Sequence, residues 1–195
     1  MLWIPSVEVE SNQGTREVNL LTRHFMDRKI FLTGPIDADV ANNFVSQLLY
    51  LAEDDDPITI YINSPGGEVN AGLLIYDAIQ GCDLPLNMIC TGLAASMAAI
   101  ILAGGQLGRR SILPHSRMMI HEPLISDGVG GSATSIKNIS DSILSTRDIL
   151  NGILAKHTGK SRRQIAQATS FDNTMNAEDA VSFGLVDRIA TSIWG

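Results

Sequence analysis

Residues 58–80 read ITIYINSPGGEVNAGLLIYDAIQ, and this stretch decides the fold class. Its first five residues are rich in β-branched side chains and predict a buried strand. The sequence NSPGG at 63–67 predicts a tight turn that exposes its backbone. Apolar residues then recur at helical spacing as far as Ile79, which predicts an amphipathic helix. A strand, a turn and a helix in this order are the repeating unit of an α/β fold.

The alternation of strand and helix continues on both sides of this stretch. Towards the N-terminus, KIFLTG at 29–34 predicts a strand, and the spacing at 40–52 predicts a helix capped by Asp37 or Asp39. Towards the C-terminus, LNMIC at 86–90 predicts a strand that leads through 91–92 into an alanine-rich helix. SILPHSRMMIHEP at 111–123 predicts two short strands around a turn. This pattern predicts an α/β fold with a mainly parallel sheet.

Three further segments complete the predicted organisation. Residues 1–20 predict a polar N-terminal arm or hairpin, with a turn at 12–14. Residues 132–156 predict the longest helix, roughly 38 Å at ~1.5 Å per residue, and this length suggests that it projects toward a partner. Two short helices are expected on either side of Asp172. We expect all 195 residues to form one domain.

Composition excludes several classes of function. The net charge is −7, and the longest basic runs are two residues long, so no nucleic-acid partner is expected. The longest near-apolar run, 93–103, is shorter than the roughly 20 residues that span a bilayer, so no membrane partner is expected. Cys82 and Cys90 lack CxxC spacing, and no signal-peptide pattern is present, which indicates a cytoplasmic protein. The histidines show no metal-ligand spacing, so no metal is expected.

One hydroxyl, Ser96, lies among small and apolar residues in TGLAASMAAI at 91–100. A serine at the start of a helix often serves only as its cap. The same position also suits a nucleophile, because amides at a helix start are unpaired and the helix dipole is positive there. In that case the amide of Met97 is the natural donor to an oxyanion. The segment alone leaves both interpretations open.

A serine nucleophile needs a histidine base, an orienting carboxylate and oxyanion donors. Three polar or glycine-rich loops are expected where predicted strands end, at 64–67, 92–96 and 121–122. His121 follows an apolar strand and is a candidate base, and His115 in the preceding turn is its rival. Asp172 is one of 21 acidic residues. None of these residues is decisive alone.

Four motifs taken together resemble, in order and spacing, the ClpP family, the proteolytic subunits of ATP-dependent Clp proteases. They are YINSPGGEVNAG (61–72), TGLAASMAA (91–99), LPHSRMMIHEP (113–123) and NAEDAVSFGLVD (176–187). The resemblance covers almost the whole chain. It implies a serine endopeptidase with a crotonase-like fold of repeated β-β-α units, in which residues 124–156 form a projecting handle. It implies no metal and no organic cofactor.

The resemblance also implies a role for each site residue. Ser96 matches the nucleophile, His121 the general base and Asp172 the third member of the triad. Gly67 and Met97 match the two backbone donors of the oxyanion hole. Substrate binding is implied for Gly66, Leu124 and Ile125.

Partners follow from the same resemblance. ClpP subunits form seven-membered rings that stack in pairs around a closed chamber, which implies a homo-heptamer or a double-ring tetradecamer. A separate AAA+ unfoldase of the Clp family uses the ATP, and the sequence contains no P-loop of its own. The implied substrate is unfolded polypeptide.

This sequence departs from the family pattern at a few positions. Ser170 and Phe171 replace a charged pair that usually precedes the triad aspartate, and Thr59 and Ser111 occupy two commonly aromatic docking positions. These departures keep an alternative open, namely a weakly active structural or regulatory subunit that needs a second ClpP in a mixed ring. An acyl-CoA enzyme on the same fold is less favoured, because such enzymes do not rely on a Ser-His-Asp set.

Overall fold

A mostly parallel sheet forms the centre of the computed structural model, which describes residues 4–11, 14–125, 128 and 130–193. Its parallel strands are, in spatial order, β3 (Lys29–Thr33), β4 (Ile58–Ser64), β5 (Leu86–Ala95), β6 (Arg110–Ile112) and β9 (Arg188–Ile189). Two more strands extend it beyond the β5–β6 pairing. β7 (Arg117–Ile120) is parallel to the last part of β5, and β8 (Asn173–Met175) is antiparallel to β7. The predicted α/β fold with a mainly parallel sheet is confirmed.

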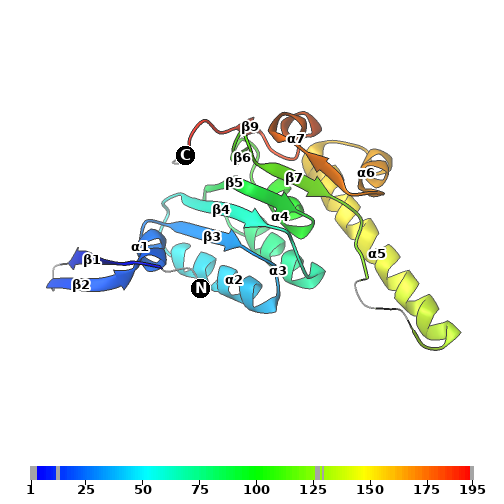
Figure 1. Ribbon diagram of the computed structural model, residues 1–195, viewed down its shortest axis with the longest axis horizontal. Coiled ribbons are helices and arrows are strands. Elements are labelled where there is room, and N and C mark those ends of the chain that lie inside the picture. Colours follow the sequence, from blue (N-terminus) through cyan, green and yellow to red (C-terminus); the bar gives the residue numbers. More distant parts are fainter. Residues whose placement is uncertain (1–3, 12–13, 126–127, 129, 194–195) are drawn as a thin grey trace.

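Helices connect the strands and cover the sheet (Figure 1). They are α2 (Ala38–Leu51), α3 (Val69–Gln80), α4 (Met97–Ala103), α5 (Ala133–Thr158), α6 (Arg162–Thr169) and α7 (Ala177–Phe183). α2, α3 and α4 lie side by side on one face of the sheet. Their apolar stripes and the strands bury one continuous core, which includes Ile60, Ile75 and Ile101, each fully buried.

The long helix α5 projects beyond the sheet (Figure 1). Ser132 caps its start, and Gly159 ends it in a left-handed conformation with φ 70°. Only residues near its C-terminal end are buried, among them Leu150 and Leu154. The predicted long projecting helix is therefore confirmed, with bounds that differ by one or two residues.

The N-terminal arm is an antiparallel hairpin of β1 (Ser6–Ser11) and β2 (Gly14–Asn19). Residues 12–13 of the predicted turn lie outside the described residues. A short helix, α1 (Leu20–Met26), follows, and the side chain of Asn19 caps it by accepting a hydrogen bond from Thr22. The sequence did not predict α1, because none of its residues is buried and no apolar stripe marks it.

Two predictions need correction, one for the segment after β5 and one for the segment around Asp172. Residues 91–95 continue β5 and do not begin the alanine-rich helix, which starts only at Met97. The reason is tertiary, since Ala94 and Ala95 pair with Met118 and Met119 of β7. The two helices expected around Asp172 are present as α6 and α7, but the unpredicted strand β8 lies between them.

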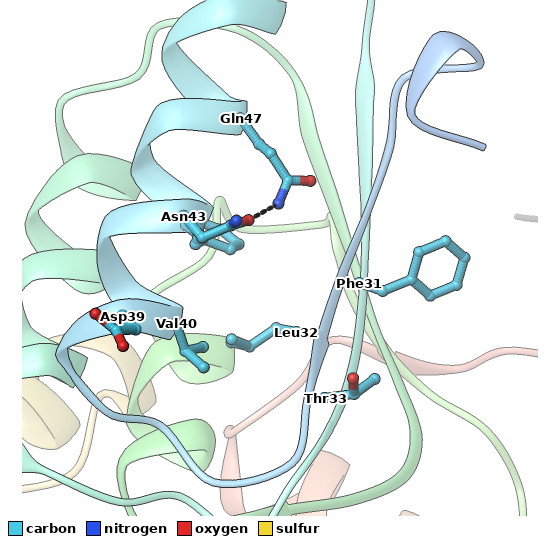
Figure 2. Close-up of a pocket in the computed structure, with 8 residues that line it drawn as sticks. Phe31, Leu32, Thr33, Asp39, Val40, Asn43 and Gln47 are labelled. Carbon is cyan, nitrogen blue, oxygen red and sulfur yellow. Dashed lines mark hydrogen bonds between the residues drawn. The ribbon is translucent and has the colours of Figure 1, made fainter. Parts of the chain in front are cut away.

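The start of α2 resolves a choice between two aspartates. Asp37 is the cap, because its carboxylate accepts a hydrogen bond from the amide of Val40 at 2.8 Å. Asp39 instead lines a cavity of about 300 Å³ between β3 and α2, together with Asn43 and Gln47, which are hydrogen-bonded to each other (Figure 2). Every residue that lines this cavity comes from β3 or α2.

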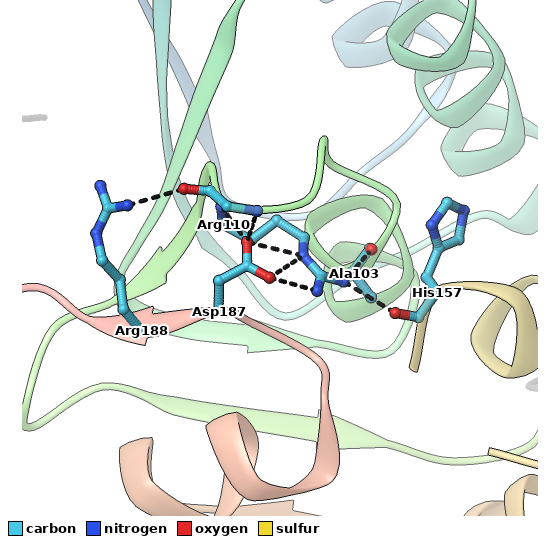
Figure 3. A network of polar contacts seen from close by, with 6 residues as sticks. Ala103, Arg110, His157, Asp187 and Arg188 are labelled. Atoms are coloured by element: carbon cyan, nitrogen blue, oxygen red, sulfur yellow. Dashed lines mark hydrogen bonds and ion pairs between the residues drawn. The ribbon is translucent and has the colours of Figure 1, made fainter. Parts of the chain in front are cut away.

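A buried ion pair at the amino end of β6 connects β6, α4 and α5 to the segment that precedes β9 (Figure 3). Arg110 is 3% exposed, and its guanidinium contacts the carboxylate of Asp187 at 2.6 Å. The same guanidinium donates hydrogen bonds to the carbonyl of Ala103 at 2.8 Å and to that of His157 at 3.2 Å. These two carbonyls belong to the last turns of α4 and α5. Arg110 therefore fixes both helix ends to the sheet.

Candidate active site

The carboxyl ends of β4, β5 and β7 meet and bring the three predicted loops together. The turn at 65–67 follows β4, Ser96 follows β5, and His121 follows β7. Pro65, Gly67, Ser96, Met97 and His121 all line one cavity. The three loops follow strand ends, as the sequence predicts, and the structure adds that they meet.

Ser96 lies in a sharp turn from β5 into α4. Its φ is 53°, a conformation that costs a residue other than glycine on the order of 1–3 kcal/mol. The backbone offsets this strain, because the amide of Ser96 donates to the carbonyl of Met119 at 2.8 Å and its carbonyl accepts from Ala99 at 3.0 Å. A strained strand-to-helix turn that presents a hydroxyl is the geometry of a nucleophile elbow, here built without the G-x-S-x-G sequence.

The hydroxyl of Ser96 does not cap α4, because its side chain makes no capping hydrogen bond. It lies 2.9 Å from Nε2 of His121, and Nδ1 of His121 lies 3.0 Å from a carboxylate oxygen of Asp172. An ionised carboxylate only accepts, so Nδ1 donates to Asp172 and Nε2 is left to accept from Ser96. Both distances are within the reach that nucleophile activation requires. The structure therefore brings together Ser96, His121 and Asp172.

Strand pairing holds His121 and Asp172 side by side. In the antiparallel β7–β8 ladder, Ile120 pairs with Asn173, and these are the residues next to His121 and Asp172. The amide of Glu122 also donates to the carbonyl of Thr169 at 2.8 Å. A strand of three residues shows too little periodicity to be recognised in the sequence, so β8 and its pairing with β7 were not predicted.

The rival histidines lie elsewhere. His115 is exposed in the turn between β6 and β7 and does not line the cavity at Ser96. His157 lies in the last turn of α5, where its ring is hydrogen-bonded to the hydroxyl of Tyr76 at 2.9 Å. The choice between His115 and His121 is therefore settled in favour of His121 as the histidine that contacts Ser96.

Two backbone amides face the space beside Ser96. Ile36 bonds to both neighbours of Gly67, since its amide donates to Gly66 at 2.9 Å and its carbonyl accepts from Glu68 at 2.8 Å. In an extended segment alternate residues bond to opposite sides, so the amide of Gly67 points away from Ile36. Met97 is the first residue of α4, where amides have no partner within the helix. Within the described part of the chain, neither amide donates a hydrogen bond to the protein.

An apolar cavity of about 210 Å³ adjoins the Ser96 hydroxyl. Its apolar walls are Val69, Met97, Ile100, Met119, Leu124 and Leu150. A larger groove of about 700 Å³ runs from there between residues 68–70 and α5, and it is lined by Leu124 and Ile125. Gly66 is buried within the turn and is not among the residues that line either space. The arrangement can hold an extended chain with one apolar side chain beside Ser96.

Two other kinds of site are absent from the described residues. They contain no group of three or more His, Cys, Asp or Glu side chains placed to hold a metal ion. None of the helices in the described ranges combines the length and the apolar character needed to cross a membrane.

Similarity to known proteins agrees with this geometry. The sequence model described as Clp protease matches residues 12–192 of the 195-residue chain. The matched range contains the hydrogen-bonded side chains of Ser96, His121 and Asp172 and the amides of Gly67 and Met97. Because the match covers nearly the whole sequence, the chain belongs to the Clp protease family.

Proposed function

We propose that this chain is a serine endopeptidase subunit in which Ser96 is the nucleophile, His121 the general base and Asp172 the group that orients the base. One observation carries the proposal. A continuous chain of hydrogen bonds, 2.9 and 3.0 Å long, joins the three side chains next to two amides that have no partner among the described residues. Membership of the Clp protease family supports the same conclusion.

The reaction follows the usual course of serine peptidases. Nε2 of His121 takes the proton of Ser96 while the hydroxyl oxygen bonds to the scissile carbonyl carbon. The amides of Gly67 and Met97 donate to the resulting oxyanion, and one such donor is worth about 10²–10³ in kcat. The C–N bond then breaks, His121 protonates the leaving amine, and water hydrolyses the acyl-enzyme by the same route.

The proposed substrate is unfolded polypeptide. An extended chain fits the groove between residues 68–70 and α5, where Leu124 and Ile125 contact it. The apolar cavity beside Ser96 favours an apolar side chain before the cleaved bond, because burial of such a side chain contributes roughly 1.5–3 kcal/mol.

The proposed working form is a cytoplasmic ring assembly, a homo-heptamer or double-ring tetradecamer fed by an AAA+ unfoldase of the Clp family. The support is the projecting part of α5, which exposes Ile136 and Leu144. Apolar side chains gathered on one projecting helix indicate a surface that another subunit covers. Enclosure in a chamber would also prevent folded proteins from reaching the active site.

A second candidate function is a weakly active subunit that requires another ClpP in a mixed ring. The observation that favours it is Phe171, which is 60% exposed directly beside Asp172 and follows Ser170 where the family usually has charges. Light scattering on the protein alone and mixed with a conventional ClpP separates the candidates. A homo-oligomer that hydrolyses peptides by itself excludes the mixed-ring requirement.

Labelling with a fluorophosphonate probe tests the proposed chemistry. The probe reacts with activated serine hydroxyls, so mass spectrometry of the assembled protein should find a single adduct on Ser96. Ser96→Ala should abolish both labelling and peptide hydrolysis. Ser116→Ala is the matched control, because Ser116 is buried and its hydroxyl donates to the carbonyl of Cys90 at 3.2 Å, away from His121, and it should label normally. Absence of an adduct on Ser96 in every assembled form would contradict the proposal.

A further inference from the structure

A buried hydroxyl lies directly beneath the turn that carries the Gly67 amide. Ser64 is the last residue of β4 and is 1% exposed. Its hydroxyl donates a hydrogen bond to the carbonyl of Gly34 at 2.6 Å and accepts one from the amide of Gly66 at 3.1 Å. Ser64 is thus bonded on both sides, yet it takes no part in the hydrogen bonds around Ser96.

The two partners of Ser64 lie on different elements. Gly34 follows β3, and its own amide donates to the carbonyl of Asn63 at 3.1 Å. Gly66 lies in the middle of the turn, in a left-handed conformation with φ 87°. One side chain therefore connects the end of the neighbouring strand to the centre of the turn. Because the hydroxyl is buried, water cannot replace either hydrogen bond.

Gly66 in turn packs against the segment that carries the nucleophile. A Cβ atom on Gly66 would lie 2.6 Å from the carbonyl oxygen of Ala95 and 2.7 Å from Cβ of Ser96. The turn and the strand end therefore touch backbone against backbone, with no space between them. Any shift of Gly66 changes the position of the next amide, that of Gly67, relative to Ser96.

We propose that Ser64 is a positioning residue, whose hydroxyl fixes Gly66 so that the amide of Gly67 meets the oxyanion. This inference rests on the proposed peptidase function and adds a residue outside its triad and its oxyanion donors. Ser64 acts through Gly66 and does not touch the substrate. The oxyanion exists only after attack, so loss of Ser64 lowers kcat and leaves ground-state binding unchanged.

Ser64→Ala in the full-length assembled protein tests this inference. A misplacement of about 1 Å can cost ~100-fold, so we expect kcat for a leucine-containing peptide to fall roughly 10- to 100-fold. KM should stay within about two-fold of that of the unmodified protein, because the contacts that bind the substrate before reaction are retained. The matched control is Ser116→Ala, since Ser116 is 4% exposed and its hydroxyl donates to the carbonyl of Cys90 at 3.2 Å, away from the turn at 65–67. This control should lose similar thermal stability but keep its kcat.

Two more measurements separate positioning from general destabilisation. A peptide aldehyde forms a hemiacetal whose oxygen occupies the oxyanion site, so its inhibition constant should weaken in Ser64→Ala by about the same factor as kcat. Ser64→Cys keeps the shape of the side chain with a weaker donor, so its kcat should lie between those of Ser64→Ala and the unmodified protein. It also keeps the inference testable if the alanine variant does not fold.

The outcomes distinguish this inference from the proposed function. If Ser96 is labelled and either Ser64 variant retains the kcat of the Ser116→Ala control, Ser64 has no positioning role and the peptidase function stands. An increase in KM at unchanged kcat would overturn the inference in the same way. If the unmodified protein neither labels at Ser96 nor hydrolyses peptides, the proposed function fails, and this inference fails with it.

Discussion

The three side chains of the hydrogen-bonded chain differ in their contact with solvent. The side chain of His121 is 15% exposed, whereas that of Asp172 is 74% exposed. Solvent weakens the attraction between two charges, by roughly four-fold between an effective dielectric constant of about 20 and that of bulk water. In the proposed mechanism, Asp172 therefore contributes mainly by orienting the ring of His121 and fixing its tautomer, and less by stabilising the imidazolium charge.

Asp172→Asn should accordingly be a milder change here than in a site with a buried carboxylate. Loss of a buried triad aspartate lowers kcat by about 10⁴, and we expect a loss on the order of 10²-fold for this exposed residue. Steady-state hydrolysis of a short peptide measures the effect. Asp55→Asn, in an exposed loop, is the matched control and should retain full activity. A 10⁴-fold loss would show that the assembled protein buries Asp172.

Among the site residues, the sequence pattern alone left the roles of Ser96 and His121 open. A serine before an apolar helix is consistent with a cap or a nucleophile, and only the contact with His121 separates the two. Asp172 could not be singled out, because its position depends on β8, whose pairing partner lies more than fifty residues earlier in the chain. The resemblance of four motifs supplied these assignments where local pattern could not.

At the level of elements, periodicity predicted those helices and strands that bury a regular face. The strand at 58–62 and the helix that follows it are examples, and β4 and α3 match them closely. The boundary between β5 and α4 was wrong, because alanine at 94, 95, 98 and 99 carries no strong signal for either state. Pairing with β7 decides it, and that contact is not visible in local sequence.

Helix α6 offers a test of stability that is separate from chemistry. Its start is a capping box, in which Ser161 accepts a hydrogen bond from the amide of Gln164 at 3.3 Å and the Gln164 side chain accepts one from the amide of Ser161 at 3.0 Å. Loss of such a cap costs about 1 kcal/mol, so Ser161→Ala should lower Tm by roughly 2–4 °C. Peptide hydrolysis should be unchanged below that temperature, because Thr169 at the other end of α6 keeps its bond to Glu122.

Ser46→Ala is the matched control for this prediction. Ser46 is exposed within α2, and its hydroxyl bonds back to the carbonyl of Asn42 at 2.8 Å. Such a bond does not favour a helix, and alanine is the better helix former, so this variant should have an unchanged or slightly raised Tm. Calorimetry measures Tm for both variants. Equal losses of Tm would show that the capping box contributes nothing to the stability of the protein.

For the molecule as a whole, the buried ion pair and the proposed catalytic residues lie at opposite ends of the sheet strands. The buried pair of Arg110 and Asp187 lies at the amino end of β6, and Ser96 and His121 lie where β5 and β7 end. Removing one partner of a buried pair costs about 3–5 kcal/mol, because the other charge is left buried without a partner. We call this pair, with its hydrogen bonds to α4 and α5, the anchor. Titration at this anchor should therefore affect folding without changing the chemistry of the site.

Two groups at this anchor link stability to pH. Burial lowers the pKa of His157, and the nearby charges of Lys156 and Arg110 lower it further. For Asp187, burial alone would raise the pKa, but hydrogen bonds from Arg110 and from the backbone outweigh it, so the pKa is lowered. In both cases the unfolded chain binds the proton more readily than the folded protein does. Both groups therefore make the folded state less stable as the pH falls.

The two groups act over different pH ranges. The contribution of His157 is complete above its unfolded pKa of about 6.5 and is lost as the pH falls from there toward the lower folded value, whereas that of Asp187 is lost only below about 3.9. Tm should thus fall between about pH 7.5 and 5.5, and His157→Gln should reduce this fall because glutamine does not titrate. His115→Gln, at an exposed histidine, is the matched control and should keep the pH dependence of the unmodified protein. If His157→Gln loses as much Tm on acidification as the control, the pH dependence originates elsewhere than at the anchor.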